Sequence, residues 1–311
     1  MKLGFRNNKF WFYFKSYIGE WVPFTIWLKL GRKFKRSNYT RTHQKRIDYY
    51  NKLSKVHSLG PEAHSIAALT RPKKLKTYYF DTLRISRYFP SDLKIDYWFG
   101  DITQVPEHPK LVKSRPIRGA NENSILFKLN QIRHFNFIDD PIPFERKKDM
   151  LIGRAMVKQP QRRRFYEMYF DHPLCDLGQI NRGTEHDHWV RPKLSIAEHL
   201  LNKFILCIEG FDVATNLKWV MSSNSVAVMP EPTYESWYME GTLMPNVHYI
   251  RVASDFSDVE QVLEYYITHP EACLKIIKNA QAYTQKFRDP QIEKEVAYGV
   301  LDKFFKNTGQ I

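Results

Sequence analysis

The pattern of apolar and polar positions is clearest after residue 148, where short apolar runs alternate with longer mixed stretches. Mostly apolar runs predict buried strands, and they occupy residues 150–152, 204–208, 225–229 and 248–252. The stretches between and after them predict helices over residues 160–170, 213–222, 258–268 and 270–287. Strands that alternate with helices indicate an α/β domain with a mostly parallel sheet, which binds ligands at the carboxyl ends of its strands.

Helix starts are marked by capping signals in the same half of the chain. The Ser-x-x-Glu sequences at residues 195–198 and 257–260 match the capping box, in which serine and glutamate satisfy the first free amides of a helix. Pro160 and Pro270 suit the first helical turn, where a missing amide proton costs nothing. These signals fix where several of the predicted helices begin.

The first half of the chain has shorter apolar runs separated by proline and glycine. Residues 97–99 are Tyr-Trp-Phe and lead into Gly100 and Asp101, which predicts a strand that ends in a loop. Residues 135–138 end at an Asp-Asp-Pro sequence and predict a second strand with a stop signal. The patterns together predict four segments: a basic aromatic segment at 1–46, an N-terminal domain at 47–148, a C-terminal domain at 149–290, and a final helix at 291–311.

Length and charge narrow the class of protein. The 311 residues are 43% apolar, which is enough for a substantial core and argues against a disordered chain. The formal net charge of +15 indicates an anionic partner, either nucleic acid, phosphates or an acidic membrane surface. Charge alone does not choose among the three.

Residues 1–46 carry most of this charge, with twelve Lys and Arg against the single acidic residue Glu20. Rings lie between the cations: Phe10, Trp11, Phe12, Tyr13, Phe14, Trp21, Phe24 and Trp27. Basic plus aromatic composition is typical of a segment that lies in the interface of an anionic membrane. The alternative is that these rings form the core of an N-terminal helical cap, and one helix can do both.

Cysteine usage and hydropathy bear on the compartment. Cys175, Cys207 and Cys273 are far apart and form no CxxC pair, which favours a reduced cytosolic setting over a disulfide or zinc framework. The basic start has no clear signal-peptide cleavage site, and no apolar run reaches the ~18 residues of a membrane span. We expect a cytoplasmic protein that is peripheral on the inner face of the inner membrane.

Several catalytic motifs are absent from the sequence. The chain has neither the GxGxxG dinucleotide fingerprint nor a phosphate-binding GxxxxGK[ST] loop, and it has no GxSxG nucleophile elbow. Residues 185–188, Glu-His-Asp-His, fit either a metal site or, more simply, a solvated polar loop. Because no Asp-x-Asp pair exists to hold a metal–diphosphate complex, we expect no metal or other cofactor.

Protein cations are available to neutralise phosphates instead. Gly153 and Arg154 follow a predicted strand, and Arg162 enters the helix that comes next. The strongest local signal is the predicted strand 204–208, followed by a glycine turn and a predicted helix whose first turns are polar. A helix start of this kind receives anions. The residues that would form it are Glu209, Gly210, Ala214, Thr215, Asn216 and Lys218.

The run 203–287 resembles glycosyltransferase family 90, which includes bacterial lipopolysaccharide core transferases and eukaryotic protein O-glucosyltransferases. The matching segments include 99–101, 113–116, 153–162, 203–218, 223–225, 234–238, 245–249 and 255–258. The resemblance covers about residues 75–305, and the sequence of 212–219 is most similar to the bacterial core-biosynthesis branch. Eukaryotic members carry an arginine where this chain has Asn216, so the donor phosphates would depend more on Arg154, Arg162 and Lys218.

The resemblance implies a GT-B fold, which is an α/β architecture of two Rossmann-like domains facing across a cleft. The N-terminal domain would bind the acceptor and the C-terminal domain the nucleotide. The implied reaction transfers a hexose from UDP-glucose or UDP-galactose to a lipopolysaccharide core oligosaccharide, with inversion and without a metal, at an anionic membrane surface. The implied nucleotide-sugar site comprises Gly153, Arg154, Arg162, Glu209, Gly210, Ala214, Thr215, Asn216, Lys218 and Glu235.

Inverting transfer needs a base that takes the proton of the acceptor hydroxyl. Asp101 is the first candidate because it follows a predicted strand, and the matching aspartate is the base in the family's protein O-glucosyltransferases. The other N-terminal carboxylates are Asp92, Asp96, Glu107, Glu122, Asp139 and Asp140.

Two other functions remain open at this point. One is an enzyme of the same fold that glycosylates protein or capsule. The other is a non-enzymatic basic module that binds lipid or nucleic acid through residues 1–46. The aromatic residues there form one block instead of the spaced stacking platform of single-strand binders, so we expect no nucleic acid partner.

Overall fold

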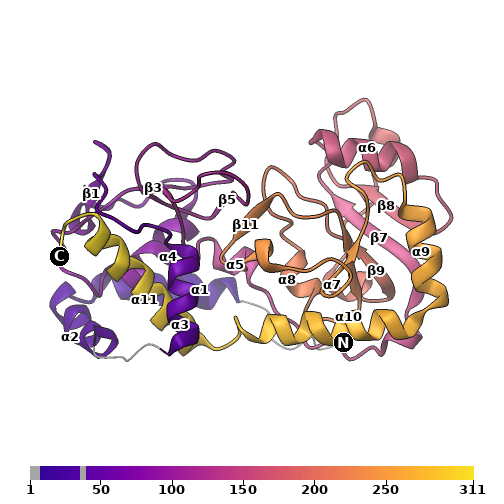
Figure 1. The fold of residues 1–311 in the computed structure, drawn as a ribbon. Helices are drawn as coiled ribbons and strands as arrows, with labels where there is room; N and C mark the ends of the chain where they lie inside the picture. The colour runs from indigo at the N-terminus through magenta and orange to yellow at the C-terminus, as the bar shows by residue number, and fades with distance from the viewer. Residues whose placement is uncertain (1–7, 36–39) are drawn as a thin grey trace. The chain divides into compact units, whose positions relative to one another are not determined.

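The computed structural model describes residues 8–35 and 40–311, and it divides into two compact units (Figure 1). Residues 134–232 and 242–286 form the first, which we call the large-sheet unit. The remaining described residues, 8–133, 233–241 and 287–311, form the second, which we call the three-strand unit. The described residues of the predicted segments 1–46 and 291–311 lie in the three-strand unit, while the predicted segment 47–148 contributes residues 47–133 to that unit and residues 134–148 to the large-sheet unit.

The large-sheet unit has the α/β alternation that the sequence predicts. Its strands are β7 (Lys148–Ala155), β8 (Cys175–Gln179), β9 (Asn202–Leu206), β10 (Val226–Met229) and β12 (Ile250–Arg251). Its α-helices are α6 (Pro160–Tyr169), α7 (Ile196–His199), α8 (Leu217–Val220), α9 (Val259–Thr268) and α10 (Pro270–Gln285), and its 3-10 turns are η2 (Phe144–Arg146) and η3 (Asp187–Trp189). Figure 1 shows β7, β8 and β9 running together, with α6 and α9 close to them.

The five strands form one parallel sheet in the order β12-β10-β9-β7-β8. Read along the chain, β7 comes first, and β8 and β9 are added on its two sides. This is the doubly wound order in which the direction of winding reverses at the first strand. The consecutive residues Leu151 and Ile152 are both buried, so the sheet is covered on both faces.

The core of this unit joins strand residues to the three longest helices. Leu151, Phe204, Val228 and Ile250 of the strands pack in one cluster with side chains of α6, α9 and α10. The helical members are Phe165, Tyr166, Tyr169, Val259, Leu263, Tyr266, Cys273, Ile276 and Ile277. Burial of these apolar groups fixes the sheet, and with it the loops at the carboxyl ends of the strands.

The three-strand unit contains more helix than sheet. Its helices are α1 (Lys9–Trp21), α2 (Phe24–Lys35), α3 (Arg41–Tyr50), α4 (Lys76–Ser86), α5 (Gln131–His134), which ends at the boundary, and α11 (Pro290–Asn307), together with the 3-10 turns η1 (Ile66–Ala68) and η4 (Glu240–Thr242). Its strands are β1 (His64–Ser65), β2 (Lys94–Ile95), β3 (Tyr97–Trp98), β4 (Lys110–Val112), β5 (Ser114–Pro116), β6 (Ser124–Leu126) and β11 (Tyr234–Ser236). The strands β3, β4 and β6 form a parallel sheet in chain order.

A buried carboxylate ties the C-terminal helix to this unit. Glu293 of α11 is 5% exposed and accepts hydrogen bonds from Arg46 of α3, Lys128 and the indole of Trp237. Loss of these partners would leave a charge buried without compensation. The final helix therefore packs with residues from the first half of the chain.

Three predictions of local structure are wrong. Residues 135–138 are not a strand, and the amide of Ile138 donates to Ser222 Oγ instead of to a neighbouring strand. The predicted helix 213–222 is reduced to the single turn α8, Leu217–Val220. The second capping box does not form, because Ser257 bonds to Asp255 and the helix begins at Val259.

The first capping box is confirmed, since Ser195 and Glu198 exchange the expected hydrogen bonds.

Within residues 8–35 and 40–311, no helix combines the length and the apolar character that a membrane crossing requires.

A buried aspartate in α4 predicts a pH dependence of stability. Asp81 accepts hydrogen bonds from the amide and side chain of Gln131, and burial raises its pKa from 3.8 to about 6. The folded state then holds the proton more tightly than the unfolded chain, so its stabilising effect is present below pH 3.8 and lost as the pH rises through about 6. We expect the stability of the wild type relative to Asp81→Asn to fall by up to ~3 kcal/mol across this window. Urea unfolding at a series of pH values measures it, and a constant difference would contradict the assignment.

Candidate active site

The topological switch point of the large sheet lies between β7 and β9. Loops that leave the two strands on either side of such a point diverge, and ligands of doubly wound sheets bind in the crevice between them. Here these loops begin after Ala155 of β7 and after Leu206 of β9. The candidate site is therefore sought among residues 156–162 and 207–216.

Arg162 joins these two loops. It lies in the first turn of α6, and its guanidinium donates to the carbonyl oxygens of Met156, Ile208 and Glu209 at 3.0, 3.0 and 3.1 Å. Its neighbour Gln161 donates to the carbonyls of Glu209 and Gly210. The first turn of a helix and a fixed positive charge therefore lie together at the carboxyl edge of the sheet, an arrangement that suits phosphate groups.

Gly210 fits closely against this cation. A Cβ placed on Gly210 would lie 3.1 Å from Arg162 Nη2, so a larger residue would press against the guanidinium. The loop that follows is held by turns, because the amide of Gly210 donates to the carbonyl of Asp212. The predicted helix start after Gly210 is thus replaced by a turn, and the helix N-terminus at this edge is that of α6.

The remaining predicted residues of the loop differ in exposure. Thr215 and Asn216 are partly exposed, whereas Ala214 and Lys218 are buried, with Lys218 at 0%. The amide of Asn216 donates to the carbonyl of Leu206, the last residue of β9. Asn216 therefore helps to fix the loop on the strand.

Arg154 has different partners from Arg162. It donates to Asp176 Oδ1 at 2.7 Å and to the carbonyls of Gly153, Asp176 and Pro192. Its side chain is 9% exposed. Asp176 lies at the start of β8, while the switch-point loops follow the ends of β7 and β9. Burial raises the pKa of the Tyr166 hydroxyl to about 12 and both cations act to lower it, so they lie near the same ring although their hydrogen bonds go to different groups.

Glu235 lies in the three-strand unit, on β11. The strand pairs antiparallel with β5, where Arg115 is its direct partner, and the Arg115 Nε to Glu235 Oε1 distance is 2.8 Å. Tyr49 also donates to this carboxylate, which is 2% exposed. Glu235 is thus the buried partner of an arginine, and its membership of the nucleotide-sugar site stays a prediction.

Asp101 follows β3 of the three-strand unit, as predicted. Its side chain is 40% exposed and pairs with Lys113, whose Nζ lies 2.5 Å from Asp101 Oδ1. Lys113 directly follows β4, the parallel neighbour of β3. Because the carboxyl ends of parallel strands meet at one edge of a sheet, the chain places this acid and this amine together. The exposed carboxylate remains accessible to a substrate hydroxyl.

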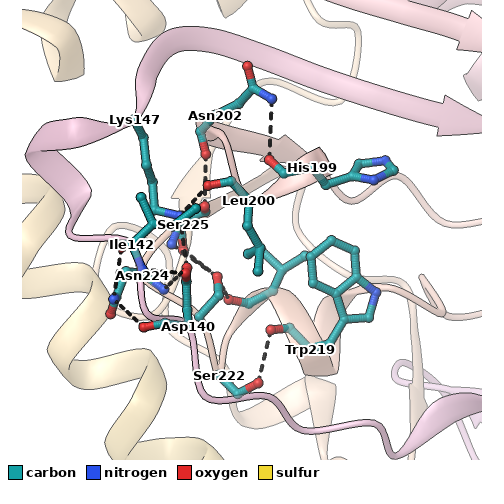
Figure 2. A network of polar contacts seen from close by, with 12 residues as sticks. Asp140, Ile142, Lys147, His199, Leu200, Asn202, Trp219, Ser222, Asn224 and Ser225 are labelled. Atoms are coloured by element: carbon teal, nitrogen blue, oxygen red, sulfur yellow. Dashed lines mark hydrogen bonds and ion pairs between the residues drawn. The ribbon is translucent and has the colours of Figure 1, made fainter. Parts of the chain in front are cut away.

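Asp140 has a structural environment instead (Figure 2). Its carboxylate is 1% exposed, lies 2.8 Å from Lys147 Nζ, and accepts the amide of Asn224 at 2.9 Å. The side chain of Asn224 donates to the carbonyls of Asp140 and Ile142. Burial lowers the pKa of Lys147, and the lysine also donates to the carbonyl of Leu200. Asp140 therefore fixes one loop of the large-sheet unit and has no open side for a substrate.

The acidic histidine-rich loop is also organised by its own contacts. Asp187 accepts the amides of Gly183 and Thr184, and these bonds lower the pKa of its carboxyl group. His186 stacks on Trp189 with ring centroids 4.1 Å apart. In the part of the chain that the structure describes, no group of three or more His, Cys, Asp or Glu side chains is arranged as metal ligands.

Sequence reasoning missed two residues that complete these sites. Lys113 lies in the matching segment 113–116 and directly follows Leu111 and Val112 of β4. Gln161 precedes Arg162 and bonds to the same loop. The signal for Lys113 was its position after a strand that lies parallel to β3. No sequence signal pointed to Gln161.

Comparisons with known proteins show the family of the chain. The family described as glycosyl transferase family 90 matches residues 148–294. The O-glucosyltransferase LpsA of Dichelobacter nodosus is 42% identical over 262 residues, which cover 84% of this chain and 82% of the relative. The chain belongs to glycosyltransferase family 90. It is therefore an enzyme that transfers a sugar.

The family match begins with β7 and extends through α10 into α11. It includes both switch-point loops and Arg162, whereas Asp101 and Lys113 lie upstream of it. The family match therefore contains all five strands of the large sheet.

The buried pair of Asp140 and Lys147 predicts a loss of stability when it is broken. Asp140→Asn leaves a buried ammonium without its counter-charge, and we expect the free energy of unfolding to fall by about 3–5 kcal/mol. The matched control is Asp149→Asn, which breaks an ion pair with Lys203 in which the carboxylate is 48% exposed, and it should cost less than ~1 kcal/mol. Chemical denaturation measures both. Equal small losses would show that the buried pair has no structural role.

Proposed function

We propose that this protein transfers glucose from UDP-glucose to a lipopolysaccharide core oligosaccharide, with inversion at the anomeric carbon and with Asp101 as general base. Glucose is chosen over galactose because the relative is named an O-glucosyltransferase, and its name LpsA favours a lipopolysaccharide acceptor. The observation that carries the proposal is the position of Arg162 and the first turn of α6 at the switch point of the large sheet.

The large-sheet unit would bind the UDP part of the donor. Arg162 would lie against the diphosphate, and the amides at the start of α6 would add a partial positive charge. As the glycosidic bond breaks, negative charge grows on the diphosphate, and a cation fixed in place stabilises that charge without reorganising. The three carbonyl contacts of Arg162 support this role, because they hold the guanidinium in one place before the donor arrives.

The three-strand unit would supply the base. The Asp101 carboxylate would accept the proton of the acceptor hydroxyl while that oxygen attacks the anomeric carbon and UDP leaves. The ion pair with Lys113 would keep the carboxylate oriented. The acceptor would therefore bind in the three-strand unit, as in a GT-B enzyme. We also propose that the enzyme acts on the cytoplasmic face of the inner membrane, where the lipopolysaccharide core would be its acceptor.

The substrate assignment is tested with purified enzyme, truncated lipopolysaccharides and a panel of UDP-sugars. We expect glucose transfer to dominate and the product to have inverted stereochemistry by NMR. Galactose transfer would correct the donor. Transfer to protein or capsular polysaccharide, with none to lipopolysaccharide, would overturn the acceptor.

Asp101→Asn keeps the shape of the side chain but removes its basicity. We expect turnover to fall by about two to four orders of magnitude, the usual effect of losing a general base. UDP affinity should be unchanged, because the donor site lies in the large-sheet unit. Asp92→Asn, an exposed carboxylate of the same unit, is the control and should retain full turnover. An Asp101→Asn enzyme as active as the wild type would exclude this base.

Arg162→Ala removes the cation at the switch point. We expect UDP binding to weaken by about 1.5–3 kcal/mol, the usual contribution of a hydrogen bond to a charged group. Arg164→Ala is the matched control, because this arginine lies on the same helix but is exposed. Calorimetric titration with UDP measures the difference, and thermal unfolding checks that both variants fold. Equal affinities for the two variants would remove Arg162 from the site.

A further inference from the structure

The basic aromatic segment separates into an inner and an outer face. On the inner face of α1, Phe12 is buried in a cluster with Tyr79, Phe80, Leu83 and Ile132. This part of the segment is core, as one of the two sequence interpretations predicted.

The outer face of α1 is also apolar but is exposed. Trp11, Phe14, Ile18 and Trp21 are 52%, 45%, 50% and 87% exposed. Their spacing of three, four and three residues places them on one stripe of the helix. A helix that is apolar all round is normally buried on all sides, so the outer stripe of α1 needs a partner.

The exposed large hydrophobic side chains are concentrated in α1 and α2. Among the described residues, twenty large hydrophobic side chains are exposed, and eight of them belong to α1 and α2. The eight are Phe10, Trp11, Phe14, Tyr17, Ile18, Trp21, Ile26 and Leu30. An apolar patch of this kind marks an interaction surface.

Cations surround the stripe. Lys9 and Lys15 of α1, and Lys29, Arg32 and Lys33 of α2, are all exposed. The loop before α4 adds exposed Lys73 and Lys74, and it is held to α1 by an ion pair between Arg71 and Glu20 at 3.0 Å. Glu20 is the only acidic residue among residues 8–35, so its pairing leaves the surface strongly positive.

We propose that the outer stripe of α1, with Trp11, Phe14, Ile18 and Trp21 as its members, inserts into the headgroup region of an anionic phospholipid bilayer. Aromatic rings settle at the depth of the headgroups, and surrounding lysines are attracted by anionic lipid. The positive surface complements this partner. The inner face meanwhile remains packed on α4, so the helix lies on the membrane without leaving the fold.

This inference rests on the membrane location in the proposed function and assigns that contact to one surface of the chain. Binding to vesicles is measured without donor or acceptor, so its failure would leave the test of sugar transfer unaffected.

The experiment is flotation of the full chain with vesicles of phosphatidylcholine alone or of an equal mixture with phosphatidylglycerol. We expect binding to the mixed vesicles only, and weaker binding as salt rises. Trp11→Ser with Phe14→Ser should reduce the affinity by about tenfold or more, since two rings leave the interface. The matched control, Met168→Ser with Leu274→Ser, alters residues 43% and 42% exposed in the large-sheet unit, and it should bind like the wild type.

A charge test separates local from overall attraction. Lys9→Glu with Lys15→Glu should lower the affinity by at least about fivefold per residue, as expected for one charge near an anionic surface. Lys275→Glu with Lys278→Glu, exposed on α10, changes the net charge equally and should have little effect. Equal losses for the two pairs would mean that binding follows net charge, and would overturn the proposed surface.

Trp21→Ser is the safeguard if the double variant does not fold, because this side chain is the most exposed of the stripe. It should fold and bind more weakly than the wild type. Absence of wild-type binding to both kinds of vesicle would contradict the membrane proposal. A wild-type dimer that is lost in Trp21→Ser would contradict it too, and would assign the stripe to a second copy of the chain.

Discussion

The candidate donor site depends on the hydrogen bonds that the guanidinium of Arg162 donates to two loops. The carbonyls of Met156, Ile208 and Glu209 that it joins belong to the two loops that diverge from the switch point. The guanidinium places a positive charge beside carbonyl oxygens that would by themselves repel a phosphate. The parallel sheet provides the edge and Arg162 gives it a positive charge.

Two aspartate–lysine pairs show how burial assigns different roles to the same chemistry. Asp140 and Lys147 are both buried, so the two charges pair with each other and fix a loop. Asp101 is 40% exposed while Lys113 is 3% exposed, so the amine is part of the framework and the carboxylate faces outward. An exposed carboxylate held by a fixed cation can meet a substrate, whereas an enclosed pair cannot. This contrast supports Asp101 over Asp140 as the base.

Four strands of the large sheet could be predicted from the sequence because each contains a short, mostly apolar run, and α6 could be predicted from Pro160 at its start. The fifth strand, β8, could not be predicted because its sequence, Cys-Asp-Leu-Gly-Gln, is not an apolar run. The helix after Gly210 could not, since the bond from Asn216 to the end of β9 replaces helical geometry there and depends on tertiary contacts. The different hydrogen-bond partners of Arg154 and Arg162 could not be predicted for the same reason. A spacing of eight residues does not reveal that one side chain bonds to Asp176 and the other to the switch-point loops.

The central claim is that the donor nucleotide binds at the switch point between β7 and β9. Hydrogen–deuterium exchange of the full chain with and without saturating UDP tests it most directly, because it reports every backbone amide separately. The account predicts slower exchange in residues 156–163 and 207–216 when UDP is present. Unchanged exchange in both segments, with protection confined to the three-strand unit, would contradict it.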